Sequence, residues 1–538
     1  MEPAKPRSDS RRKFLRCLAS SVILSEAIPL AKRRNGEVEG PLPPQMASAE
    51  RFSSKPVKSL RPPEAPVRPT IQQLSQEIRK HSLSPVELTR DCLTRIEKLN
   101  PSLNAFITVL ADSALDQARR AEQEIQGGHY RGPLHGVPIG LKDILDTAGA
   151  RTTAASAQYK DRIPTEDAEV VRRLRAAGAV ILGKQNLHEF AYGGSSMISF
   201  FGEVHNAWDP SRVAGGSSGG SATSVAAGLG LAAVGTDTAG SIRLPAAYCG
   251  VVGLKPTYGR VSARGVVPLA WSYDHVGPIA NSVHDAAILL QVLAGYDAGD
   301  PASVDAPVAD YTAALDKLPP KLRIDVPRAF FFDDLHPEVA AVVEKAIEVF
   351  RRLHSEIRDV KLEVSTDRTL SSAESWAFHE PMVAKSPELY QPATLGRIKS
   401  AMNTTAAAAL RARRELDAAR QSMWGGHSCP PKPYGIFEKV DVLLTPTVPI
   451  PPPVIAELRE HPENLRPAEL LMLRNTRPFN VWGIPAISVP CGFTSDGLPI
   501  GLQLAAAPWR EDLVLQVAHA YEQVTDWHKK MPDQPITA

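Results

Sequence analysis

The alternation of short apolar runs with amphipathic segments, from about residue 133 onward, restricts the possible fold of this chain more than any other feature. Residues 137–141 and 179–182 are apolar runs of the length expected for buried strands. The segment 169–177, which precedes the second run, has the spacing of an amphipathic helix. Strand-like runs return at 440–444 and 486–489. This pattern predicts an α/β fold in which helices cover a sheet.

Helical spacing marks both ends of the predicted folded region. Apolar residues recur at intervals of three or four over 71–78 and 86–96, and Ser84 before a proline is a typical helix start. Residues 510–524 are predicted to form a last amphipathic helix. The chain of 538 residues shows no internal repeat. We therefore predict one large catalytic domain over residues 70–530.

The N-terminal part of the chain has a different character. Residues 10–16 carry a twin-arginine export pattern, and the apolar run 17–25 that follows has the length of a signal sequence. Residues 35–69 are rich in proline, serine and charged residues, which is typical of an unfolded linker. We predict a twin-arginine signal segment over 1–34, a linker over 35–69 and export to the periplasm. A disordered basic tail on a cytoplasmic protein is the alternative.

Composition and residue spacing argue against several classes of function. Lys plus Arg number 61 and Asp plus Glu 59, so the formal net charge is only +2 and does not favour a nucleic acid or an anionic membrane as partner. No segment is long and apolar enough to be an integral membrane span. The five cysteines and the histidines lack the spacing of metal sites. We expect no metal and no cofactor.

The most informative motif is Gly-Gly-Ser-Ser-Gly-Gly-Ser at residues 215–221. Such a composition is usually a flexible linker, but here it runs directly into the apolar, alanine-rich segment 222–230. Glycines between apolar elements usually permit close backbone approach. The motif also fits the nucleophile elbow of α/β-hydrolases, with His275 or His284 as the downstream histidine. The weak strand tendency of Val213 and Ala214 argues against that reading.

Several blocks of the sequence resemble the amidase signature family. Residues 215–221, with Gly-Thr-Asp-Thr-Ala-Gly-Ser-Ile-Arg at 235–243, are similar to the signature itself. Gly-Val-Pro-Ile-Gly-Leu-Lys-Asp at 136–143 resembles the family's lysine block, and 249–257 and 480–503 resemble the blocks that follow the nucleophile. The resemblance implies a mixed central β-sheet covered by helices on both faces. It also implies a serine-dependent amidase that cleaves amide C–N bonds.

The resemblance implies a Ser-Ser-Lys triad in this chain. Ser241 would be the nucleophile, Ser217, in a cis peptide bond, the bridging serine, and Lys142 the general base. Backbone N–H groups would form the oxyanion hole, and three polar residues would support the site. The oxyanion hole would comprise Thr238, Ala239, Gly240 and Ser241, and the supporting residues would be Ser218, Asp237 and Arg243.

A lysine can act as base only if its pKa is lowered. A solvated lysine has a pKa of about 10.4 and is almost fully protonated at neutral pH. Lys142 follows the apolar residues 137–141, and removal from water would lower its pKa. A decrease to about 7.5 would cost roughly 4 kcal/mol.

Three classes of function remain after the resemblance is taken into account. The leading prediction is a free-standing amidase that hydrolyses small-molecule carboxamides through an acyl-enzyme, either alone or as a homodimer. The alternative is the A subunit of a glutamyl-tRNA(Gln) amidotransferase, which has the same blocks but is at odds with export. A catalytically silent binding protein is the third, and retention of all three triad residues argues against it. The predicted pocket walls are Tyr192 and four other aromatic residues, Trp376, Phe378, Tyr390 and Trp424.

Overall fold

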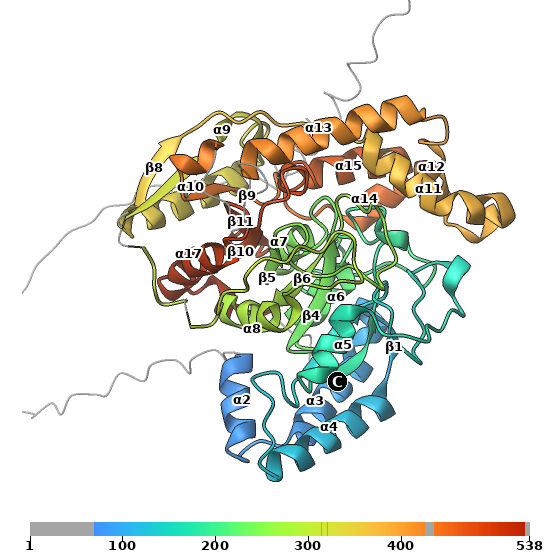
Figure 1. Ribbon diagram of the computed structural model, residues 1–538, viewed down its shortest axis with the longest axis vertical. Coiled ribbons are helices and arrows are strands. Elements are labelled where there is room, and N and C mark those ends of the chain that lie inside the picture. The colour runs from blue at the N-terminus through green and yellow to red at the C-terminus, as the bar shows by residue number, and fades with distance from the viewer. Residues whose placement is uncertain (1–68, 314, 320, 354, 425–434, 533–538) are drawn as a thin grey trace, which may run out of the picture. The chain divides into compact units, whose positions relative to one another are not determined.

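The computed structural model describes residues 69–532, except 314, 320, 354 and 425–434, and its central element is a sheet of eleven strands (Figure 1). The order across the sheet is β1-β3-β2-β4-β6-β5-β10-β11-β9-β7-β8. The strands are β1 (Phe106–Val109), β2 (Pro138–Lys142), β3 (Val180–Gln185), β4 (Ala232–Asp237), β5 (Val252–Lys255), β6 (His275–Ala280), β7 (Leu322–Val326), β8 (Ser355–Asp359), β9 (Val442–Pro446), β10 (Ala486–Phe493) and β11 (Pro499–Ala506).

The sheet is mixed, as predicted. β2 is parallel to both β3 and β4, and β7 is parallel to both β8 and β9. The central strands β4, β6, β5, β10 and β11 pair antiparallel with one another. The carboxyl ends of β2 and β4 therefore lie at the same edge of the sheet, which is where catalytic loops commonly gather in such folds.

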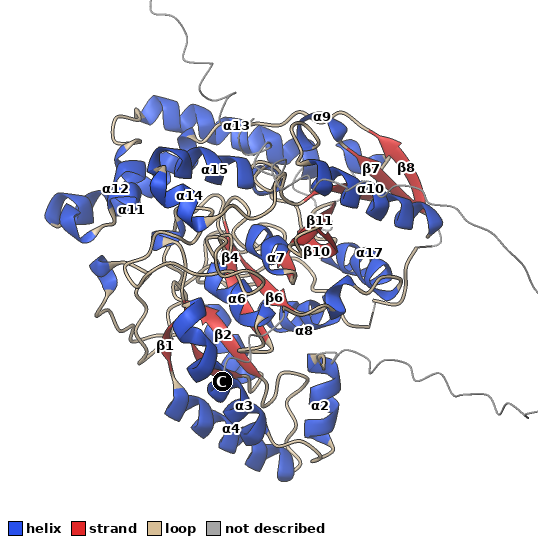
Figure 2. Ribbon diagram, turned by 180° about the vertical axis from the view of Figure 1, so that it is seen from behind, coloured by secondary structure: helices blue, strands red, loops and turns tan. Residues whose placement is uncertain are grey.

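Helices cover both faces of the sheet (Figures 1 and 2). The helices are α2 (Ile71–Arg79), α3 (Pro85–Leu103), α4 (Ala111–Gln126), α5 (Glu169–Ala176), α6 (Gly219–Ala226), α7 (Arg243–Cys249), α8 (Val283–Leu293), α9 (Arg328–Phe331), α10 (Pro337–Arg352), α11 (Thr369–Lys385), α12 (Pro392–Lys399), α13 (Ala406–Trp424), α14 (Ile455–Glu460), α15 (Leu465–Met472), α16 (Pro478–Val481) and α17 (Glu511–Gln523).

Alternating side chains of the strands assign these helices to the two faces. Ala232 and Val234 of β4 belong to the core that also contains residues of α2, α5, α8, α10 and α17. Ala233 points to the opposite face, where it packs with α6 and α7. Val180 and Leu182 of β3 pack with α3 and α4. This alternation follows from the two-residue repeat of a strand.

The sequence pattern located the main elements correctly. The predicted helix at 169–177 is α5, that at 510–524 is α17, and the predicted strand at 137–141 is β2. Ser84 caps α3, because its hydroxyl accepts hydrogen bonds from the backbone N–H groups of Val86 and Glu87.

Every described helix and strand lies in one compact unit, Arg68–Ala538. The predicted signal segment, 1–34, and all but the last residue of the predicted linker, 35–69, lie outside the described residues. Within the residues that the structure describes, no helix has the length and apolar character needed to cross a membrane.

Candidate active site

Three segments from different parts of the chain bring the predicted triad together. Lys142 is the last residue of β2, Ser217 lies two residues before α6, and Ser241 lies in the loop between β4 and α7. The backbone N–H of Ser218 donates a hydrogen bond to the carbonyl of Ser241, 3.2 Å away, which holds the two serine segments side by side. All three triad residues are buried, and Ser241 retains 4% exposure.

Lys142 makes direct contact with the bridging serine. Its Nζ lies 2.7 Å from Ser217 Oγ and 2.8 Å from Thr236 Oγ1. Burial lowers the pKa of Lys142 to about 7, although the carboxylates of Asp237 and Asp274 oppose this decrease. A substantial fraction of this lysine is therefore neutral at pH 7, as a general base requires. Thr236 is a contact of Lys142 that the sequence did not identify.

The backbone around Ser217 and Ser218 is closely packed against β4. The peptide bond between Gly216 and Ser217 is cis. Ser218 Oγ lies 3.2 Å from the carbonyl oxygen of Thr236 and can donate a hydrogen bond to it. A Cβ atom on Gly235 would lie only 2.9 Å from Ser218 Oγ, so the approach of this segment to β4 requires a glycine there. Ser218 therefore supports the site by joining the two serine segments to the sheet.

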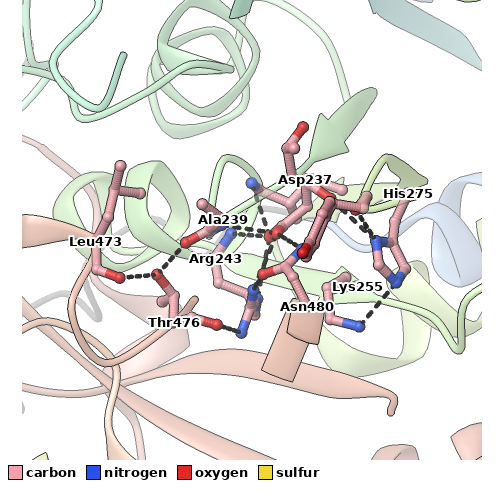
Figure 3. A network of polar contacts seen from close by, with 12 residues as sticks. Asp237, Ala239, Arg243, Lys255, His275, Leu473, Thr476 and Asn480 are labelled. Carbon is pink, nitrogen blue, oxygen red and sulfur yellow. Dashed lines mark hydrogen bonds and ion pairs between the residues drawn. The ribbon is translucent and has the colours of Figure 1, made fainter. Parts of the chain in front are cut away.

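The loop that carries Ser241 is organised around the buried carboxylate of Asp237 (Figure 3). This carboxylate accepts hydrogen bonds from the backbone N–H groups of Gly240, at 2.8 Å, and Ile242, at 3.1 Å. Asn480 Nδ2 donates to it at 2.8 Å, and Arg243 forms an ion pair with it at 2.9 Å. Burial alone would raise the pKa of Asp237, but the Arg243 guanidinium and these donors hold it well below its usual range.

Arg243 connects the same loop to the C-terminal part of the chain. Beyond Asp237, its guanidinium donates to the carbonyl of Thr476, to Gln503 Oε1 and to Asn480 Oδ1, at 2.9, 2.7 and 2.7 Å. The expected ion pair between Asp237 and Arg243 is therefore present and is one part of a larger buried network. A buried charge is tolerated only when it is paired and hydrogen-bonded in this way.

We expect the change Asp237→Asn to destabilise the protein strongly. The variant leaves the Arg243 guanidinium buried without its counter-charge and places an amide N–H₂ among N–H donors. Removing one partner of a buried ion pair typically lowers the free energy of unfolding by about 3–5 kcal/mol. Urea denaturation measures this change. Asp116→Asn is the control, since the Asp116–Arg119 pair is exposed and is worth about 0–1 kcal/mol. Equal stabilities of the two variants would contradict a bracing role for Asp237.

The predicted oxyanion hole is only partly available for substrate. The Gly240 N–H already donates to Asp237, so it shapes the loop. The N–H groups of Thr238, Ala239 and Ser241 are the remaining candidates, and all three residues line the same small cavity. The methyl group of Ala239 packs beside an apolar cluster that includes Leu473.

Of the two downstream histidines that the nucleophile elbow would need, His284 lines a cavity whose lining does not include Ser241. His275 and a further buried histidine, His188, are engaged with other side chains. His188 Nε2 lies 3.0 Å from an Arg397 nitrogen and His275 Nε2 lies 3.3 Å from Lys255 Nζ, so each of these nitrogens faces a donor. Burial lowers the pKa of both histidines well below the ordinary value. Among the described residues, no group of three His, Cys, Asp or Glu side chains forms a metal site.

A cavity of about 40 Å³ opens beside Ser241, and three arginines, Arg368, Arg466 and Arg477, line it. Tyr192 also lines this cavity, as expected. The other predicted aromatic residues do not line this cavity: Trp376, Phe378 and Tyr390 belong to an apolar cluster against which Tyr192 also packs, and Trp424 lines a different cavity. The sequence did not identify the arginines as site residues, because they lie outside every recognisable block.

Comparisons with known proteins agree on the family. The sequence profile of the Amidase family matches residues 87–515. The A subunit of the glutamyl-tRNA(Gln) amidotransferase of Geotalea daltonii is 41% identical over 488 residues, 86% of this chain and 98% of that protein. The structure of the corresponding protein of Thermotoga maritima matches with a TM-score of 0.70 and 31% identity, over 87% of this chain and 99% of its own. Peptide amidase from Stenotrophomonas maltophilia matches with a TM-score of 0.73 and 33% identity, over 86% and 98%.

The chain belongs to the Amidase family. It is an enzyme of the serine-dependent class that cleaves or transfers amide groups, and it has the mixed sheet and single domain of that class.

The comparisons also overturn three predictions. The free-standing amidase acting on small-molecule carboxamides is the wrong reading, because relatives about 40% identical over nearly their full length are subunits of an amidotransferase. The predicted absence of a nucleic acid partner is wrong for the same reason, since those enzymes are named for a tRNA substrate. The predicted export to the periplasm is also wrong, because the relatives are named for glutamyl-tRNA(Gln), a substrate that belongs to translation. The signature blocks did not separate the two classes, since both use the same amide chemistry.

Proposed function

We propose that this chain is the amide-cleaving subunit of a glutamyl-tRNA(Gln) amidotransferase, with residues 70–530 as its catalytic domain. Two observations support the proposal together. The relatives of that name share about 40% identity with nearly the whole domain. The buried contact of 2.7 Å between Lys142 Nζ and Ser217 Oγ, next to the loop of Ser241, supplies the means to activate a serine. Further subunits and the charged tRNA would be its partners.

In the proposed mechanism, Ser241 attacks the carbon of the donor amide. The Ser241 hydroxyl proton passes to Ser217 Oγ as the Ser217 proton passes to neutral Lys142. The N–H groups of Thr238, Ala239 and Ser241 stabilise the negative oxygen of the tetrahedral intermediate. The proton then returns through Ser217 to the amide nitrogen, so that the C–N bond breaks and ammonia leaves. Water hydrolyses the acyl-enzyme by the same route, and the ammonia is the nitrogen that is transferred.

We expect this chain to replace its counterpart in an amidotransferase reconstituted from the other subunits of a relative, such as that of Geotalea daltonii. The assay measures conversion of glutamyl-tRNA(Gln) to glutaminyl-tRNA(Gln) under conditions in which the native enzyme is active. Ser241→Ala is the control, since it should assemble but supply no nitrogen. Adding free ammonia should restore conversion in that control. Ser241-dependent amide hydrolysis without any conversion would contradict the assignment to the amidotransferase and would leave the hydrolytic site intact.

A further inference from the structure

The pairing of two central strands places Asp274 beside the loop that carries Ser241. β4 and β6 run antiparallel, and their register pairs Asp237 with His275. One residue further, after the end of β4 and before the start of β6, Thr238 meets Asp274. Here a side-chain contact follows the backbone ladder, because Thr238 Oγ1 lies 2.5 Å from Asp274 Oδ1. The sheet itself therefore brings this carboxyl group to the first residue of the predicted oxyanion hole.

The hydroxyl of Thr238 is the donor in this contact. Burial raises the pKa of Asp274 to about 6, so its carboxyl group is mostly ionised above about pH 7 and can only accept hydrogen bonds. A hydrogen bond to an ionised acceptor is shorter and stronger than one between neutral groups. The contact therefore holds the Thr238 side chain in one orientation.

The second oxygen of Asp274 holds another segment that lines the cavity of about 40 Å³ beside Ser241. Oδ2 accepts hydrogen bonds from the backbone N–H groups of Leu269, at 2.9 Å, and Ala270, at 3.1 Å. Leu269 lines this cavity, as does Thr238. One carboxylate thus joins two parts of the cavity lining that come from separate segments of the chain.

The peptide groups on either side of the Thr238–Ala239 peptide are held by other contacts. The Asp237 carbonyl, in the preceding peptide group, accepts a hydrogen bond from Asn480 Nδ2 at 3.0 Å. The Ala239 carbonyl, in the following one, accepts from Thr476 Oγ1 at 2.7 Å. The peptide group between them carries the Ala239 N–H. Its orientation depends on Thr238, whose side chain Asp274 holds.

We propose that Asp274 is a positioning residue of the oxyanion hole, which holds the Thr238 side chain and thereby directs the Ala239 N–H toward the oxygen that becomes negative during amide cleavage. Asp274 acts through Thr238 and makes no contact with the substrate. The inference rests on the proposed function, because it requires Ser241 to be the nucleophile. It concerns cleavage of the amide, whichever acceptor then receives the ammonia.

Two substitutions of Thr238 separate the role of its hydroxyl from that of its shape. Thr238→Val keeps the shape and the backbone N–H but removes the hydroxyl, whereas Thr238→Ser keeps the hydroxyl and removes the methyl group. Loss of one oxyanion-hole donor lowers kcat by about 10²–10³-fold, so we expect a displaced donor in Thr238→Val to lower kcat for butanamide by at least about tenfold. KM should change little, because the contact acts in the transition state. Thr238→Ser should retain most of the activity, and the reverse order would overturn the proposal.

A double-mutant cycle tests whether the hydroxyl acts through Asp274. In the Asp274→Asn background, Thr238→Val should cause little further loss of kcat, because residues that act as one unit are not additive. Losses that multiply would overturn the proposal. The measurement is made on the alkaline plateau, where a change in the pKa of Lys142 has no effect on kcat.

Ser262 and Asp297 provide the matched control for this cycle. They form a similar hydroxyl–carboxylate contact of 2.7 Å, and neither belongs to the described lining of the cavity beside Ser241. Ser262→Ala, Asp297→Asn and their combination should leave kcat within about twofold of wild type. Thermal unfolding midpoints of all variants identify any loss of activity that comes from loss of the fold.

A binding measurement separates failure of this proposal from failure of the proposed function. With butanal, the Ser241 hydroxyl oxygen bonds to the aldehyde carbon and its proton passes to the carbonyl oxygen, which then lies where the oxyanion would form. Calorimetry should show at least about tenfold weaker binding of butanal by Thr238→Val than by wild type. Equal binding by wild type, Thr238→Val and Asp274→Asn would reject the positioning role even if Ser241 is the nucleophile. Equal binding by wild type and Ser241→Ala would instead reject Ser241 as the nucleophile, and the positioning role with it.

Discussion

The change Ser241→Ala is expected to reduce amide hydrolysis by roughly a millionfold, which is the scale seen when the nucleophile of a serine hydrolase is removed. Nothing else in the small cavity supplies a nucleophilic oxygen at the position of Ser241, because the other hydroxyl groups of its described lining belong to Thr238, Tyr192 and Ser371. Ammonia release from a primary carboxamide by the full chain measures the loss. The thermal unfolding midpoint should remain close to that of the wild type, since Ser241 Oγ is small.

Ser224→Ala provides the matched control for the nucleophile. Ser224 is a fully buried serine of α6, and its hydroxyl has no hydrogen-bond partner in the described chain. Its removal should leave hydrolysis within about twofold of wild type, as expected for a substitution with little effect on stability. Substantial turnover by purified Ser241→Ala, together with loss of activity in Ser224→Ala, would move the nucleophile to the segment before α6.

Lys142→Ala is expected to lower kcat/KM by about 10²–10⁴-fold, the usual contribution of a general base. Lys142→Arg should recover little, because a guanidinium remains protonated and cannot accept the proton of Ser217. A lysine that acts only through its charge predicts the opposite, namely that arginine restores most of the activity. Steady-state kinetics of the two variants on a primary carboxamide separates the two roles. Near-wild-type activity of Lys142→Arg would exclude Lys142 as the base.

The pH dependence gives an independent test of the same role. In the proposed mechanism neutral Lys142 is the active form, and its pKa is lowered to about 7, so kcat/KM should rise as pH increases through about 7 and level off above it. Asp274, which hydrogen-bonds to Thr238 Oγ1 at 2.5 Å, also titrates in this region, because burial raises its pKa to about 6. Because the Asp274 carboxylate raises the pKa of Lys142, Asp274→Asn should keep the rising limb but shift it to lower pH. A limb that disappears in Asp274→Asn would assign it to the aspartate.

The extent to which the sequence predicted the structure differs between the fold and the site. The strands β2 and β3 and the helices α5 and α17 were predictable, because each buries an apolar pattern that its local period reveals. The order of the strands in the sheet could not be predicted as well, because pairings such as that of β5 with β10 join residues that are distant in the chain. Strand β8 has no buried residue among those described, so it lacks an apolar signal.

The family resemblance predicted the triad of the candidate site, whereas the surroundings of the triad were not predicted. Lys142, Ser217 and Ser241 occupy positions that the family resemblance specifies. Arg368 and Arg466 fall in segments whose sequence has no such pattern, and only the folded chain brings them to the cavity of Ser241.

The hydrogen bonds between Asn480 and Asp237, in the loop that carries Ser241, have a consequence for the synthesis of the chain. The Asp237 carboxylate at the centre of the loop accepts a hydrogen bond from Asn480, whose side chain is made 243 residues later. While the ribosome is still producing the intervening helices, the serine, the lysine and the bridging serine all exist without the network that holds them in place. We therefore expect the growing polypeptide to hydrolyse amides only after Asn480 has emerged, and a fragment that ends before Asn480 to be inactive.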